Sequence, residues 1–122
     1  AEIRQSALSI RELYAGRKVT AIFQPHLYSR TQDFYREFAE SLSLFDEVIL
    51  TDIYPAREKP IPGATSALIY DNLAAHVQKQ MISKSDVLAT VEAKRDELEV
   101  LVTLGAGDIE NYATEITKIL KK

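Results

Sequence analysis

Residues 18–42, KVTAIFQPHLYSRTQDFYREFAESL, contain two apolar patterns in succession. The first, over residues 18–23, is short and β-branched, and Pro25 ends it, which is typical of a strand. The second has apolar residues at helical spacing over residues 34–42, behind Thr31, whose hydroxyl can cap a helix N-terminus. The stretch therefore predicts a strand followed directly by a helix.

The same alternation extends in both directions. Helical spacing over residues 3–14 precedes Gly16, a helix stop. Downstream, the pattern predicts strands at 48–53, 77–82 and 100–104, helices at 65–73, 83–91 and 109–120, and a proline-rich loop at 55–63. The strand at 77–82 has the weakest pattern. Strands alternating with helices predict crossover connections, and hence a three-layer α/β/α, Rossmann-like domain with a mostly parallel sheet of four strands.

Composition narrows the class of protein. The 122 residues, 46% of them hydrophobic, fit one domain over residues 1–122. The net charge of −3 argues against a nucleic-acid partner, and no apolar run approaches the ~20 residues that span a bilayer, so no membrane partner is expected. The lack of cysteines and of a signal peptide fits a cytoplasmic protein. The start at Ala1, with Met81 as the one methionine, suggests a fragment.

Ligands of an open α/β sheet gather beyond the carboxyl ends of its strands. Three segments follow predicted strands and look unlike plain connectors: residues 24–31 (QPHLYSRT), 52–58 (DIYPARE) and 105–108 (GAGD). Since parallel strands end at the same edge, we expect all three segments to lie there together.

The first segment is the richest in functional groups. Arg30 offers a planar fork of donors that suits a carboxylate or phosphate, and it precedes a predicted helix N-terminus, where backbone amides favour anions. His26 is a candidate proton carrier, and Tyr28 and Ser29 lie between the two. The alternative is that Thr31 merely caps the helix while Arg30 and His26 are surface and turn residues.

The other two segments are less specific. Asp52 ends a predicted strand and Glu58 lies in the proline-stiffened loop, but either acid could instead serve a cap, a turn or a surface ion pair. The GAGD turn resembles a phosphate cradle without a full dinucleotide or P-loop motif, and its glycines could simply supply a tight turn. The residues alone predict an anion site, and a stand-alone nucleotide or phospho-sugar binding module remains open.

Four stretches resemble one known family. AIFQPHLYSRTQDFYREFAESL (21–42), TDIYPAREKPIPG (51–63), VTLGAGDI (102–109) and the opening AEIRQSALSIREL (1–13) are similar, in order, to the C-terminal domain of the Mur ligases that add L-alanine. The first stretch matches the signature Phe-Gln-Pro-His-x-Tyr-x-Arg-Thr. The family often has arginine at the position of Leu27, so Arg30 would be the principal cation here.

The resemblance implies a part of an ATP-dependent ligase that joins L-alanine to UDP-N-acetylmuramate in peptidoglycan biosynthesis. This domain would bind the amino acid, while a central domain, absent from this chain, would bind ATP and Mg²⁺, and an absent N-terminal domain would bind the UDP-sugar. The chain alone would be inactive and holds no expected catalytic or metal-ligating residue. The resemblance implies these substrate-binding residues: His26, Tyr28, Ser29, Arg30, Asp52, Tyr54 and Glu58.

Overall fold

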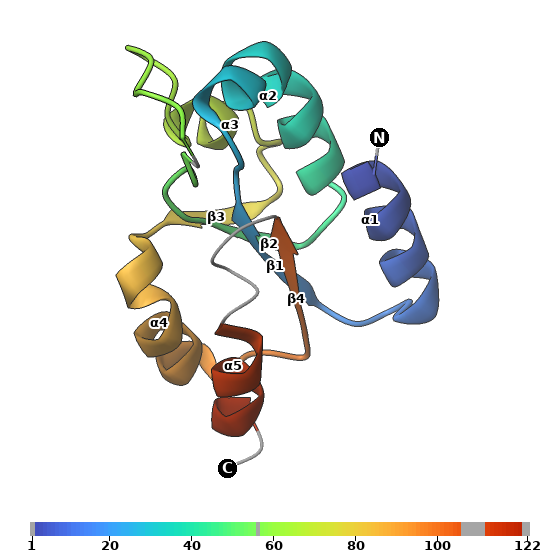
Figure 1. Cartoon of the computed structure of the whole chain (residues 1–122). Helices are drawn as coiled ribbons and strands as arrows, with labels where there is room; N and C mark the ends of the chain where they lie inside the picture. Colours follow the sequence, from blue (N-terminus) through green and yellow to red (C-terminus); the bar gives the residue numbers. More distant parts are fainter. Residues whose placement is uncertain (1, 56, 106–111, 121–122) are drawn as a thin grey trace.

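The computed structural model describes residues 2–55, 57–105 and 112–120, and Figure 1 shows their arrangement. The helices are α1 (Glu2–Leu13), α2 (Tyr28–Leu42), α3 (Ala67–Tyr70), the 3₁₀ helix η1 (Lys84–Asp86), α4 (Val87–Lys94) and α5 (Ala113–Leu120). The strands are β1 (Val19–Gln24), β2 (Glu47–Leu50), β3 (Gln78–Met81) and β4 (Val100–Gly105). All four predicted strands are therefore present.

The strands form one parallel sheet in the order β3-β2-β1-β4. Ala21, in the middle of β1, is aligned with Val48 of β2 on one side and Val102 of β4 on the other. Helices α1, α2 and α3 cover one face of this sheet, and α4 and α5 cover the other (Figure 1). The predicted three-layer α/β/α architecture is confirmed.

Alternate residues of the central strands supply two separate cores. On β1, Ala21 and Phe23 pack toward α1, α2 and α3, whereas Ile22 packs with Val87 of α4 and Ile116 of α5. Because both faces of β1 are covered, each of its side chains is buried. This double burial explains why the strand is mostly apolar and lacks a regular alternation of apolar and polar residues.

Helix α2 differs from the prediction at its N-terminus. It begins at Tyr28, three residues before Thr31, the residue expected to be its cap. The N-cap is Leu27, and Thr31 is buried in the first turn, where its hydroxyl donates to the Leu27 carbonyl oxygen at 3.0 Å. The prediction that Thr31 caps the helix was therefore wrong, and Arg30 lies inside the first turn rather than ahead of the helix.

The segment after β2 is also less regular than predicted. Strand β2 ends at Leu50 rather than Ile53, although the Thr51 amide still donates to the Phe23 carbonyl oxygen at 3.1 Å. Helix α3 spans only Ala67–Tyr70, and it ends before the predicted Leu73. At the chain's other end, the predicted helix start near Ile109 lies outside the described residues, and α5 is described from Ala113.

Ion pairs join the elements at the amino ends of the strands. Arg11 of α1 pairs with Asp46 at 2.6 Å, and the same carboxylate accepts from the Val19 amide at 2.8 Å. The side chain of Glu47, only 6% exposed, lies 2.9 Å from the amine of Lys94 on α4 and 3.6 Å from that of Lys18. These pairs lie at the edge of the sheet opposite to its carboxyl ends.

Candidate functional site

The first two predicted segments meet beyond the carboxyl ends of β1 and β2. His26 and Tyr54 form a parallel bridge, in which Tyr54 donates its amide to the Pro25 carbonyl oxygen and accepts from the Leu27 amide, both at 2.8 Å. The rings of His26 and Tyr54 stack, with centroids 5.6 Å apart and planes 16° apart. The structure therefore brings these two segments together, as the topology predicts.

The third segment begins beside the first. Gly105, the last residue of β4, is aligned with Gln24, the last residue of β1. The remainder of the GAGD turn, residues 106–108, lies outside the described residues. Gly105 has φ +125°, a conformation that glycine adopts without steric cost.

Strands β1 and β4 are neighbours, yet the helices that follow them, α2 and α5, cover opposite faces of the sheet. Such a switch point opens a crevice at the strand ends, where ligands of α/β folds bind. A cavity of about 690 Å³ is found there, which we name the β1/β4 crevice. Its lining residues are Ile3, Ser6, Phe23, Gln24, His26, Leu27, Arg30, Phe38, Leu104 and Gly105.

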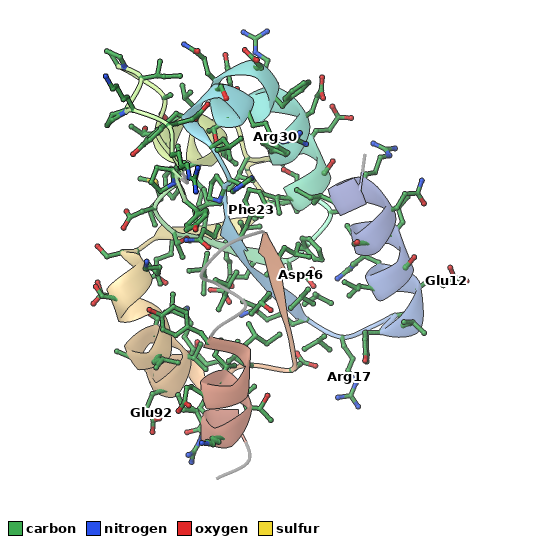
Figure 2. All side chains as sticks on the ribbon, in the orientation of Figure 1. Glu12, Arg17, Phe23, Arg30, Asp46 and Glu92 are labelled. Carbon is green, nitrogen blue, oxygen red and sulfur yellow. The ribbon has the colours of Figure 1, made fainter. Side chains whose placement is uncertain are left out.

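Two of the predicted residues, His26 and Arg30, line this crevice. Arg30 is exposed and its guanidinium carbon lies 5.8 Å from the centre of the Phe34 ring, which leaves its donors open to an anion. Figure 2 shows Arg30 on α2 and Phe23 on the neighbouring β1. Phe23 and Phe38, whose rings lie 5.7 Å apart, supply an apolar wall. The crevice thus combines a cation for a carboxylate with an apolar surface for a small side chain.

Tyr28 and Asp52 line a different cavity, of about 710 Å³, at the carboxyl ends of β2 and β3. Asp52 is exposed, and Thr51, Ser66 and Ser83 add hydroxyl groups to the same lining. The structure therefore divides four of the seven predicted residues between two cavities on one edge of the sheet, and Ser29, Tyr54 and Glu58 line neither.

Glu58 and Ser29 contact each other at the N-terminus of α2. The Glu58 carboxylate accepts a hydrogen bond from the Ser29 amide at 3.1 Å and another from the Ser29 hydroxyl. Hydrogen bonds from the Ser29 hydroxyl and amide, with a further one from the Tyr28 amide, hold the pKa of Glu58 below its usual value. The amides at this helix end, which the sequence suggested for a substrate anion, are therefore engaged by the chain's own carboxylate.

Several residues of the crevice escape prediction from the sequence. Ile3 and Ser6 enter from α1, which is remote in sequence, and no local pattern could have indicated them. Leu27 has φ 70°, a conformation that is rare for a bulky residue. Gln24 is buried, 2% exposed, and a polar residue at the end of an apolar strand is a signal that could have found it.

Other candidate sites in the described part of the chain are few. His76 is exposed, with its Nε2 3.1 Å from the Ser43 carbonyl oxygen. The described side chains include no group of three His, Asp or Glu residues that could hold a metal ion. None of the described helices has both the length and the apolar character needed to cross a bilayer.

No protein-family model matches the chain. Curated relatives do match it, and three of the most similar are each named UDP-N-acetylmuramate–L-alanine ligase. The relative from Phocaeicola vulgatus is 60% identical over 121 residues, 99% of this chain, and that from Parabacteroides distasonis is 53% identical over 122 residues, 100% of it. The relative from Flavobacterium johnsoniae is 50% identical over 121 residues, again 99%. The chain spans about a quarter, 26%, of the length of each.

The chain forms a parallel three-layer domain with a crevice at the switch point of its sheet, and it is similar to these ligases along its full length. It belongs to the Mur ligase family. Within the family, the chain is homologous to the C-terminal quarter of the UDP-N-acetylmuramate–L-alanine ligases.

Proposed function

We propose that this chain is the amino-acid-binding domain of an ATP-dependent ligase that joins L-alanine to UDP-N-acetylmuramate in peptidoglycan biosynthesis. The observation that carries the proposal is the meeting of Arg30 and His26 in the β1/β4 crevice, on a chain 60% identical to such a ligase. The reaction serves cell-wall biogenesis, and hence cell shape and division, in the cytoplasm.

In this proposal Arg30 binds the carboxylate of L-alanine, because a guanidinium fork matches a carboxylate with two parallel hydrogen bonds. The alanine methyl group faces the apolar wall around Phe23, and His26 helps to orient the amino acid. The ligase phosphorylates the muramate carboxylate with ATP, and the alanine amine then attacks the acyl carbon and releases phosphate. For that attack the amine must be held about 3–3.5 Å from the acyl carbon.

We assign ATP, Mg²⁺ and UDP-N-acetylmuramate to regions outside this chain. The described residues gather no group of three His, Asp or Glu side chains that could hold a metal ion without further ligands. A central ATP-binding domain, as a separate partner, would close against the β1/β4 crevice. Closure would complete the site and exclude water from the acyl phosphate, which water would otherwise hydrolyse.

A chimeric enzyme tests the proposal. This chain replaces the homologous quarter of the Phocaeicola vulgatus ligase, and phosphate release is measured with ATP, L-alanine and UDP-N-acetylmuramate. We expect release that depends on all three substrates, and none above blank from this chain alone or from the relative without its C-terminal quarter. A folded chimera that still binds ATP but releases no phosphate in response to alanine would overturn the proposal.

A further inference from the structure

The loop between β2 and α3, residues 51–66, holds the first turn of α2 at two points. Tyr54 pairs through its backbone with Pro25 and Leu27, immediately before the helix. Glu58, four residues further along the loop, then reaches Ser29 in the first turn with both carboxylate oxygens. A single loop therefore fixes both the approach to the helix and its first turn.

Helix α2 depends on this loop because it has no side-chain cap of its own. Its N-cap, Leu27, makes no side-chain capping hydrogen bond and has the unfavourable φ of 70°. The first amides of a helix lack partners within the helix and need acceptors from elsewhere. Glu58 provides acceptors for the amides of Ser29 and Tyr28, and its negative charge lies at the positive end of the helix dipole, where it is stabilising.

The same contact decides where a substrate carboxylate can bind. A helix N-terminus is a ready anion site, but here the Glu58 carboxylate occupies it. Arg30 follows Ser29 directly in the same turn and lines the β1/β4 crevice. An incoming carboxylate therefore finds the Arg30 guanidinium available, while the Ser29 amide of the first turn is already engaged by Glu58.

We infer that Glu58 is a positioning residue for the amino-acid substrate. It fixes the first turn of α2, and with it Arg30, beside the β1/β4 crevice, and it does so without touching the substrate. This inference rests on the proposed function of the crevice. It replaces the direct substrate contact that the sequence suggested for Glu58.

The inference is tested by Glu58→Ala in the chimeric ligase. We expect the KM for L-alanine to rise about tenfold, because a displaced Arg30 loses its charge-assisted contact, while the KM for ATP stays unchanged. Glu58→Gln keeps an acceptor for the Ser29 amide and should restore most of the affinity. Glu37→Gln, an exposed glutamate of the same helix, is the matched control and should leave both constants unchanged.

A double-variant cycle separates positioning from direct contact. In an Arg30→Ala background, Glu58→Ala should add less than about a twofold change, because residues that act through one contact are not additive. An undiminished tenfold rise in that background, or an unchanged alanine KM in Glu58→Ala alone, would overturn the inference while leaving the function of the crevice intact. A wild-type chimera without alanine-dependent activity would instead contradict the proposed function.

A second measurement follows the contact itself and does not depend on activity. In the 122-residue chain, hydrogen exchange at the Ser29 amide should speed up in Glu58→Ala and stay close to wild type in Glu58→Gln. Unchanged protection of the Ser29 amide in Glu58→Ala would show that Glu58 does not fix the first turn, and would overturn the inference.

Discussion

Gly105 approaches Gln24 so closely that a Cβ atom added to the glycine would lie 2.4 Å from the Gln24 carbonyl oxygen. Real Cβ atoms do not come this near to a backbone oxygen, so only glycine fits at the end of β4. The contact brings the last residues of β1 and β4 together beneath the β1/β4 crevice. The shape of that crevice therefore depends on a missing side chain.

We expect Gly105→Ala to destabilise the chain by about 2–4 kcal/mol, since both the steric clash and the positive φ oppose a side chain. Gly63→Ala is the control, because Gly63 also has a positive φ, +81°, but no atom within 4 Å of the added Cβ. It should cost only about 1 kcal/mol. Urea unfolding of both variants measures the difference in their free energies of unfolding. Equal losses of stability in the two variants would show that the close contact with Gln24 adds no cost.

Arg30→Ala in the chimeric ligase should lower kcat/KM for L-alanine by an amount equivalent to about 2–4 kcal/mol, since the carboxylate loses its charge-assisted partner. Arg30→Lys should recover only part, because a point charge does not reproduce the fork. The control is Arg36→Ala, which removes another exposed arginine of α2, stacked at 5.6 Å on Tyr35. Steady-state kinetics with alanine varied decide the matter, and equal effects of the two alanine variants would remove Arg30 from the site.

Acid should destabilise the chain through Glu47. Burial alone would raise the pKa of Glu47, but hydrogen bonds from Lys94 and Thr20 and the charges of Lys94 and Lys18 outweigh it and lower the pKa below 4.5. The lowered pKa contributes stability that is present above pH 4.5 and is lost as the pH falls through the folded-state value.

Glu47→Gln should therefore flatten the dependence of the unfolding free energy on pH below about 4.5, and should cost about 3 kcal/mol at neutral pH, because it leaves two lysines without their buried partner. Glu40→Gln provides the comparison, since Glu40 is largely exposed and lies 3.5 Å from Arg4. The Glu40→Gln variant should have almost the same free energy of unfolding as the wild type. Urea titrations at several pH values give both quantities, and parallel pH profiles for wild type and Glu47→Gln would contradict this account.

Arg11→Ala should weaken the packing of α1 against the sheet. It removes the 2.6 Å ion pair with Asp46, whose two side chains are partly exposed, so we expect a global loss of only about 0.5–1 kcal/mol. Amide exchange in α1 should accelerate more than exchange in β1, because the pair holds the helix against the sheet. Arg4→Ala, which removes the weaker pair with Glu40, should leave the exchange of α1 unchanged.

The 122-residue chain should bind L-alanine only in the millimolar range, about 4 kcal/mol or less, because a ligand of so few atoms cannot bind tightly to an open crevice. Calorimetry of the chain with alanine measures this affinity. Micromolar binding would show that the site is complete without closure of another domain.

The fold was largely predictable from local sequence, because apolar runs such as residues 18–23 and 100–104 are long enough to reveal strands covered on both faces. The N-terminus of α2 could not be predicted in this way. The capping pattern favoured Thr31, but Glu58, 29 residues away from Ser29, stabilises the helix end instead. A cap that comes from a distant loop leaves no local pattern, which is why propensity alone placed the helix start too late.

The site shows the same division between local and long-range information. The sequence placed His26 and Arg30 at the carboxyl edge of the sheet, where the structure has them, because both follow a recognisable strand. It could not separate them from Tyr28, which lines the other cavity, because residues close together in a helical turn point in different directions. The contribution of α1 to the crevice depends on tertiary packing alone.

Strand β3 lies at one edge of the sheet and consists of Gln78, Lys79, Gln80 and Met81. An edge strand with free backbone groups is a template for pairing with another chain, and a charged residue there opposes such pairing. Lys79 is held on this strand by the Tyr70 ring, 4.6 Å from its amine, so its charge stays at the edge. The composition that made β3 the least recognisable strand therefore protects the molecule from aggregation, and Lys79→Val should make it prone to form intermolecular β-sheet.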